Sequence, residues 1–132
     1  MKIFLGGTCN GSTWREQLIP LLTIDYFNPV VADWTPECQV EEVIQRKTCD
    51  FVIYTITPKM MGCYSIAEVV DDSNKRPKST LFCLLEKDQD KTFDSGQYRS
   101  LLAVKRMVET NGVKTFTDLK SVAEYLNIPI PE

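Results

Sequence analysis

Residues 50–70 read DFVIYTITPKMMGCYSIAEVV, and this stretch decides how the rest of the chain is interpreted. Residues 51–56 are β-branched and aromatic, which is typical of a strand buried on both faces of a parallel sheet. Pro58 ends that run, and from Tyr64 onward the apolar residues recur at helical spacing. The stretch therefore predicts a strand, a loop and a helix.

Glu68 lies in the first turns of this predicted helix. Free backbone N–H groups and the positive end of the helix dipole favour a carboxylate there. In an open parallel sheet, ligands gather outside the carboxyl ends of the strands, where such loops lie. Glu68 is therefore a candidate catalytic residue, and the alternative is a solvated helix residue stabilised by the dipole.

The 132 residues are enough for one domain, which we expect to span residues 1–132. The net charge of -3 disfavours a broad basic face for duplex nucleic acid, so we expect a small-molecule partner. No apolar run is long enough to cross a bilayer, and residues 1–5 are too short for the apolar part of a signal peptide. We therefore expect a cytoplasmic protein that does not bind membranes.

The chain contains no histidine, which excludes Ser-His-Asp and Cys-His triads and H-E-x-x-H metal sites. Its five cysteines are odd in number and include no C-x-x-C pair, which indicates neither a disulfide framework nor a zinc site. Catalysis would have to use carboxylates, hydroxyls, thiols, amines or backbone dipoles. No metal and no cofactor is predicted.

Residues 2–5 predict a first strand, which ends at Gly6 and Gly7. Two glycines permit a sharp turn and let a ligand approach the backbone. The loop over 9–13 follows, without a G-x-G-x-x-G or P-loop motif. The turn is either a phosphate- or sugar-binding turn or only a tight connection.

A second loop, residues 30–36, places Asp33 beside Trp34. An aromatic ring next to a carboxylate suits stacking on a flat ring while accepting a hydrogen bond from it. The alternative for Trp34 is packing on the core.

The helix predicted over 37–49 has an apolar stripe, which we expect to face the core. Its members are Val40, Val43 and Ile44. By themselves, the adjacent Glu41 and Glu42 are interpreted as solvated.

Strands and helices alternate five times along the chain, which predicts a doubly wound, five-stranded parallel sheet with helices on both faces, flavodoxin-like or Rossmann-like. The other expected elements are strands at 25–29, 79–85 and 113–116 and helices at 14–22, 98–110 and 118–126, the first shortened or kinked at Pro20. Residues 86–96 are predicted to be a mobile charged loop. The loops after the first three strands are expected to share one crevice.

Short motifs follow one another in a characteristic order over about the first two thirds of the chain. They are Ile3-Phe4-Leu5-Gly6-Gly7, Trp14-Arg15, Asn28-Pro29, Asp33-Trp34, Asp50 and the segment GCYSIAE over 62–68. Their order and spacing resemble the nucleoside 2-deoxyribosyltransferase superfamily, and most closely its nucleoside 2-deoxyribosyltransferase-like branch.

The resemblance implies that Glu68 is a nucleophile. Members of the family cleave the N-glycosidic bond of a 2′-deoxynucleoside or its monophosphate and hand the sugar to another base or to water. A carboxylate attacks the anomeric carbon, forms a covalent sugar ester and is then displaced, so configuration is retained. Asp33 is the candidate for the second carboxyl group, which helps the base to leave.

The resemblance also implies a set of substrate-binding residues. Glu42 matches the spacing of the family's sugar-binding acidic residue from Asp50, with Glu41 as the adjacent alternative. The full set is Gly6, Gly7, Thr8, Trp34, Glu42, Gly62 and Ser65, of which Trp34 would stack on the base and Ser65 would bind the sugar or a 5′-phosphate. Most members are oligomers whose neighbour completes the pocket, so a homodimer or higher homo-oligomer is expected.

One position departs from the family pattern. Members that act on free nucleosides have an aspartate six residues before the nucleophile, monophosphate hydrolases have a serine, and this chain has Gly62. This departure favours an alternative, a non-catalytic nucleotide-binding or signalling module of the same fold. A third alternative is an interaction domain that uses the scaffold alone.

Overall fold

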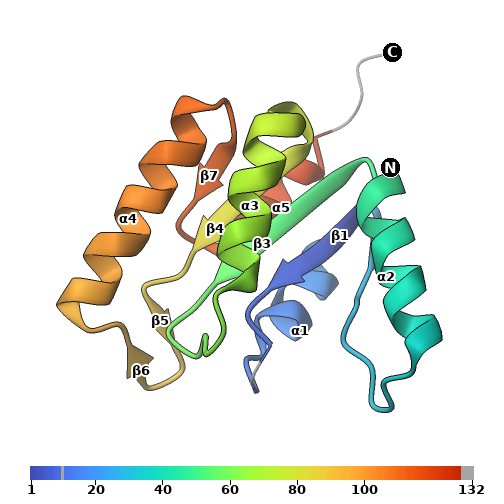
Figure 1. The fold of residues 1–132 in the computed structure, drawn as a ribbon, viewed down its shortest axis with the longest axis horizontal. Helices are drawn as coiled ribbons and strands as arrows, with labels where there is room; N and C mark the ends of the chain where they lie inside the picture. Colours follow the sequence, from blue (N-terminus) through green and yellow to red (C-terminus); the bar gives the residue numbers. More distant parts are fainter. Residues whose placement is uncertain (10, 129–132) are drawn as a thin grey trace.

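A sheet of five parallel strands forms the centre of the computed structural model, which describes residues 1–9 and 11–128 (Figure 1). Asn10, in the predicted loop, and residues 129–132 lie outside the described residues. The strands run in the order β2-β1-β3-β4-β7 and are β1 (Lys2–Gly7), β2 (Asp25–Phe27), β3 (Phe51–Ile56), β4 (Thr80–Leu84) and β7 (Lys114–Phe116). This is the flavodoxin-like order, and the predicted fold class is confirmed.

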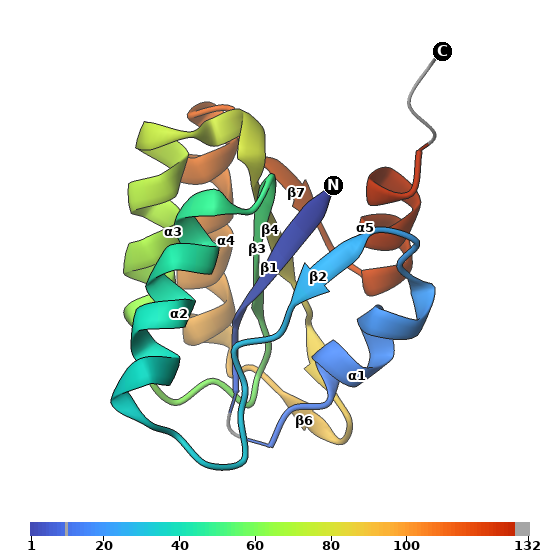
Figure 2. The same cartoon turned by 90° about the vertical axis from the view of Figure 1, so that its right-hand side faces the viewer.

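Helices cover both faces of the sheet. They are α1 (Trp14–Leu18), α2 (Pro36–Thr48), α3 (Tyr64–Lys75), α4 (Ser95–Thr110) and α5 (Leu119–Leu126). Helices α1 and α5 lie on one face and α2, α3 and α4 on the other (Figure 2). As predicted from Pro20, the first helix ends early and continues as the 3-10 turn Ile19–Leu21. Within the described residues, no helix has both the length and the apolar character needed to cross a membrane.

Alternate residues of β3 enter two separate cores. Ile53 is fully buried in the core beneath α1 and α5, and Tyr54 is fully buried in the core beneath α3 and α4. A strand that is buried on both faces needs apolar residues at nearly every position, which explains the continuous run read from the sequence. Strand β4 is likewise buried at every position, as expected for two neighbouring strands in the interior of the sheet.

Helix α2 turns its apolar stripe away from the core, so the prediction that this stripe faces inward is wrong. Val40 is 60 % exposed and Val43 is 59 % exposed, and no residue of α2 is buried. The half-buried residues of α2 are Cys38, Glu42, Gln45 and Arg46, which lie on the opposite side of the helix. The physical reason is that Arg46 pairs with carboxylates of α3, which holds the polar side of α2 toward the body of the protein.

The segment after β4 is also different from the prediction of a mobile loop. It forms a hairpin of β5 (Lys87–Asp88) and β6 (Lys91–Thr92). The hairpin is held because the buried Asp88 carboxylate accepts hydrogen bonds from Ser12 Oγ at 2.5 Å and from Thr57 Oγ1 at 2.7 Å. Helix α4 then starts three residues earlier than predicted, because the Asp94 side chain accepts from the Gln97 N–H.

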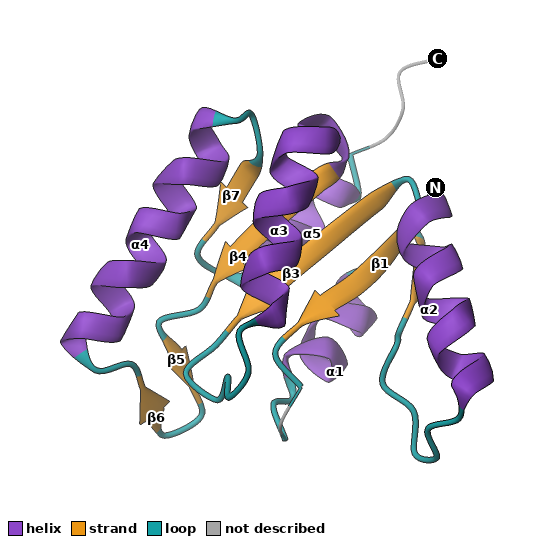
Figure 3. Cartoon of the chain, in the orientation of Figure 1, coloured by secondary structure: helices purple, strands orange, loops and turns teal. Residues whose placement is uncertain are grey.

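The strand order reverses between β1 and β3, where the chain leaves β1 for β2 on one side and later continues from β3 to β4 on the other. The loops that follow β1, β2 and β3 lie at one edge of the sheet, at the bottom of Figure 3. This is the edge at which open parallel sheets bind ligands.

Candidate active site

A cavity of about 340 Å³ opens at this switch point. Its walls come from the end of β1, the β2–α2 loop, α2 and the start of α3. Among the predicted site residues, those lining it are Gly6, Gly7, Trp34, Glu42, Ser65 and Glu68. An adjoining cavity of about 230 Å³ shares Gly7 and Ser65 with it and adds Thr8 and Gly62. The structure therefore brings every predicted site residue except Asp33 to these two cavities.

Glu68 projects from the second turn of α3 toward this crevice. Its side chain is 20 % exposed, and Oε2 lies 3.4 Å from Nε of Arg46 on α2. A freely solvated helix glutamate would be far more exposed and unpaired. The carboxylate is thus held in a cavity wall, where a bound molecule can reach it.

Burial raises the pKa of Glu68 above its ordinary value. Arg46 opposes this shift, whereas the negative charges of Glu42 and Asp72 add to it, and the net shift of the pKa is upward. The negative charge of Glu42, on α2, therefore acts on Glu68, on α3. The Glu68 carboxyl group therefore binds its proton more tightly than a solvated glutamate does.

Glu42 and its neighbour Glu41, the two alternatives for the sugar-binding position, face different ways. Glu42 lines the cavity with Glu68. The exposed Glu41 instead accepts a hydrogen bond from Gln45 Nε2 at 2.8 Å on the helix surface. Of the two, Glu42 is the residue that a ligand in the cavity would meet.

Asp33 is exposed on the β2–α2 loop and does not line either cavity. Its backbone oxygen lies 4.0 Å from the Cys38 thiol, at the start of α2. Its neighbour Trp34 does line the larger cavity and is 61 % exposed, so the alternative in which Trp34 packs on the core is wrong. The role of Asp33 stays a prediction.

Gly6 and Gly7 are the last two residues of β1 and pair with β3, so the turn predicted at these glycines is strand instead. Arg15 stabilises this end of β1. This buried guanidinium donates through Nε to the Leu5 carbonyl at 3.0 Å and through Nη1 to the Thr8 carbonyl at 2.7 Å. Burial lowers the pKa of Arg15, although nearby Cys9 opposes the shift. Thr8 itself is buried, and its Oγ1 accepts from the Thr57 N–H at 3.0 Å, so it joins the ends of β1 and β3.

A model of the family described as nucleoside 2-deoxyribosyltransferase like matches residues 1–87. The chain belongs to this family. The match confirms the resemblance seen in the sequence, and it spans β1 to β4 with every residue that lines the two cavities. Comparisons with curated proteins and with solved structures gave no significant match.

Three further residues of this deoxyribosyltransferase-like chain belong to the site but were not among its predicted residues. They are Arg15 and Tyr64, which line the larger cavity, and Arg46, which pairs with Glu68. Tyr64 is the first residue of α3 and is 75 % exposed. The sequence contained a signal for Tyr64, because it is an aromatic residue at the start of the helix that follows the β3–α3 loop. Arg46 had no such signal, because a basic residue near a helix end is common.

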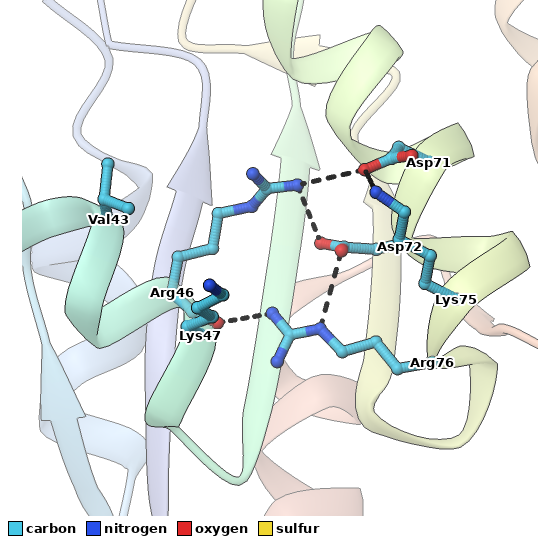
Figure 4. A pocket seen from close by; sticks show the side chains of 7 residues that line it. All are labelled: Val43, Arg46, Lys47, Asp71, Asp72, Lys75 and Arg76. Carbon is cyan, nitrogen blue, oxygen red and sulfur yellow. Dashed lines mark hydrogen bonds and ion pairs between the residues drawn. The ribbon is translucent and has the colours of Figure 1, made fainter.

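A third cavity, of about 260 Å³, lies between the later turns of α2 and α3 (Figure 4). It is lined mainly by charged side chains, and Figure 4 shows Arg46 and Arg76 directed at Asp72. All the residues that line this cavity belong to α2, α3 or the residue after α3, and none belongs to the loops at the ligand-binding edge of the sheet. Within residues 1–9 and 11–128, no group of three or more acidic or cysteine side chains is arranged to hold a metal ion.

Proposed function

We propose that this chain cleaves the N-glycosidic bond of nucleosides or nucleoside monophosphates through a covalent sugar ester on Glu68. One observation carries the proposal: the half-buried Glu68 carboxylate shares a cavity with Trp34 and with the glycines at the end of β1. Family membership supports the same substrate class. A cavity of this size suits a ligand of nucleoside dimensions.

The reaction has two steps. In the first, a Glu68 oxygen bonds to the anomeric carbon while the bond from that carbon to the base nitrogen breaks, and the base leaves with the electron pair and gains a proton from an acidic side chain. In the second, a free base or water attacks the same carbon, the ester bond breaks, and the acidic side chain recovers a proton from the attacking molecule. Both steps pass through an oxocarbenium-like transition state, and two inversions retain configuration.

Asp33 is our candidate for the acid, and Glu42 is the alternative because it already lies in the cavity wall. The two are distinguished by a leaving base that needs no proton, such as a 7-methylated purine, which carries a positive charge before cleavage. The Asn or Gln variant of the true acid would lose turnover of ordinary nucleosides but keep turnover of the 7-methylpurine nucleoside. The other variant would treat both substrates alike.

The larger cavity would hold the base of the substrate, and the smaller cavity would hold the sugar edge or a 5′-phosphate. Trp34 and Tyr64 offer aromatic rings for the base. Thr8, Gly62 and Ser65 line the smaller cavity, beside the first turn of α3. Free N–H groups at the start of a helix favour a 5′-phosphate or the polar edge of the sugar.

The test is base release from a panel of nucleosides and monophosphates, with and without a second free base, separated by chromatography. We expect release by the parent protein and at least a 1000-fold loss in Glu68→Gln, because the amide cannot act as the nucleophile. Glu41→Gln is the matched control, with the same change on an exposed neighbouring helix surface. Equal rates for Glu68→Gln and the parent would refute the mechanism.

A second candidate is a module that binds nucleotides without cleaving them. The observation that favours it is Gly62, which leaves empty the position where catalytic relatives carry an aspartate or serine; a Cβ there would meet nothing within 4 Å. A rise in melting temperature with nucleotide, and no base released over hours, would favour this candidate.

We also propose that the chain is a cytoplasmic homo-oligomer. The exposed apolar stripe of α2, formed by Val40, Val43 and Ile44, supports association because such a surface is usually covered. Val43→Glu should lower the molar mass measured by light scattering if α2 forms the interface. The exposed Lys47→Glu change on the same helix is the control.

A further inference from the structure

Arg46 reaches across from α2 to contact three carboxylates of α3. Its Nε lies 3.4 Å from Glu68 Oε2, and its Nη2 lies 3.3 Å from Asp72 Oδ2 and 4.0 Å from Asp71 Oδ2. Figure 4 shows the guanidinium directed from α2 toward Asp71 and Asp72. The arginine therefore links the helix that carries Glu42 to the helix that carries Glu68.

A buried tyrosine fixes where this guanidinium lies. The Tyr54 hydroxyl accepts a hydrogen bond from Arg46 Nε at 2.8 Å and donates to Asp72 Oδ2 at 2.6 Å. Tyr54 is fully buried in β3, and Asp72 is buried as well. Two rigid neighbours, one in the sheet and one on α3, thus set the orientation of Arg46.

Arg76 completes this arrangement from the other side. Its Nε lies 3.5 Å from the second oxygen of Asp72, and its Nη2 donates to the backbone oxygen of Arg46. The end of α2 is therefore fastened to α3 by contacts that do not involve Glu68.

The contact with Glu68 is an ion pair that occupies one oxygen. At 3.4 Å it is longer than a charge-assisted hydrogen bond, which is about 2.7–2.9 Å. Within the described residues, no side chain donates a hydrogen bond to Oε1 of Glu68. One oxygen is held by charge while the other stays available to a reacting carbon.

Charged and titratable groups surround Glu68 from several elements. Glu42 and Arg46 approach from α2 and Asp72 from α3, while Arg15, Cys9 and Tyr64 line the shared cavity. Burial raises the pKa of Glu68, and the negative charges of Glu42 and Asp72 add to this shift. The positive charge of Arg46 lowers the pKa of Glu68. A nucleophilic carboxylate must be ionised, so Arg46 opposes the effects that favour the inactive acid form.

We propose that Arg46, oriented by Tyr54 and Asp72, is a positioning residue that keeps Glu68 an oriented carboxylate in the crevice. The catalytic role of this contact rests on the proposed function, in which Glu68 is the nucleophile. The ion pair and its consequence for Glu68 are measurable without turnover.

The direct test follows the Glu68 carboxyl carbon by NMR in protein labelled with ¹³C-glutamate, with the signal assigned from its loss in Glu68→Gln. Titrations compare the parent protein with Arg46→Gln, Arg46→Lys and Lys47→Gln. Lys47 is the matched control, since it is the next residue of the same helix and lines the third cavity, away from Glu68. Circular dichroism checks that each variant is folded.

We expect the midpoint of the Glu68 titration to move to higher pH in Arg46→Gln, to move less in Arg46→Lys and to stay unchanged in Lys47→Gln. The lysine keeps a positive charge but cannot make both contacts of the planar guanidinium. An unchanged midpoint in Arg46→Gln would overturn the inference.

The pH dependence of kcat/KM separates this inference from the proposed function. If Arg46 acts through Glu68, Arg46→Gln should lose about tenfold at the acidic side of the profile and recover as the pH rises. An equal loss at every pH would indicate a purely structural role and overturn the inference while leaving the proposed function intact. If the parent releases no base, the proposed function fails, and the titration still decides whether Arg46 holds Glu68 ionised.

Discussion

Gly7 at the end of β1 lies against the Thr55 backbone of β3 so closely that a Cβ on Gly7 would stand 2.2 Å from the Thr55 carbonyl oxygen. Gly7 also has a φ of 122°, which side chains rarely tolerate. The Thr8 N–H donates to that same carbonyl at 2.9 Å, so the contact is part of the junction between the two strands. The wall of the crevice therefore depends on the absence of a side chain at this position.

Gly7→Ala should lower the free energy of unfolding by about 3–5 kcal/mol, because it combines backbone strain with a steric clash. Gly11→Ala is the control, since Gly11 also has a positive φ of 78° but its Cβ would meet no described atom within 4 Å. Strain alone should cost that variant about 1 kcal/mol. Urea unfolding measures both, and equal losses would show that the contact with Thr55 has no effect.

Asp88→Ala should lower the free energy of unfolding by about 2–3 kcal/mol, because the hydroxyls of Ser12 and Thr57 lose their shared acceptor. Asp90→Ala, on the exposed turn of the same hairpin, should change stability by less than about 0.5 kcal/mol. Chemical denaturation compares the two variants. A loss of similar size in both would mean that the hairpin is not held through Asp88.

Glu68→Gln should leave the fold intact and make it more stable than the parent at neutral pH. Because the pKa of Glu68 is raised, the folded protein binds this proton more tightly than the unfolded chain. The parent therefore loses stability as the pH rises from the ordinary glutamate pKa of 4.5 through the raised pKa, whereas the amide does not titrate.

The difference between the two proteins should be smallest below pH 4.5 and should grow above it. Denaturant unfolding at several pH values measures this difference. A parent that gains stability relative to Glu68→Gln with rising pH would mean that the ion pair with Arg46 outweighs the cost of burial.

Gly62→Asp should fold normally, with a change in stability within about 0.5 kcal/mol, because the position is open and exposed. A carboxylate there should accept a hydrogen bond from a sugar hydroxyl and repel a 5′-phosphate. We expect it to raise the ratio of kcat/KM for deoxynucleosides over their monophosphates. Gly62→Ser, which adds no charge, is the control, and an unchanged ratio in Gly62→Asp would separate this position from substrate choice.

The parallel sheet with helices on both faces and the crevice at its edge could be predicted from the sequence because they follow from local patterns. Continuous apolar runs indicate strands buried on both faces, as in β3 and β4, and the two glycines mark the last residues of β1. Once the strands are parallel, their carboxyl ends must share an edge. The grouping of Gly6, Trp34 and Glu68 follows from that geometry.

The orientation of α2 could not be predicted in this way. An apolar stripe such as Val40 and Val43 indicates that one side of a helix is covered, but it does not say whether the cover is the same chain or a partner. The side that faces the body is instead set by the ion pairs of Arg46, which depend on residues 22 and 26 positions further along the chain.

Two other features depend on contacts between distant segments. Tyr54 reads as one more apolar residue of a buried strand, yet its hydroxyl joins Arg46 to Asp72. The hairpin at Lys87–Thr92 has a charged sequence with weak strand preference, and it forms because Asp88 accepts hydrogen bonds from two other loops. Long-range polar contacts of this kind leave no periodic signal.

Mass spectrometry of the intact protein can detect the proposed bond between Glu68 and the sugar. Acid-quenched samples are compared after mixing with a 2′-fluoro-arabinosyl nucleoside, whose fluorine slows the oxocarbenium-like steps and lets an intermediate accumulate. We predict a mass increase of one fluorinated sugar, located by peptide mapping at Glu68 and absent from Glu68→Gln. Base release with no attached sugar, or with the sugar on another residue, would show that Glu68 is not the nucleophile.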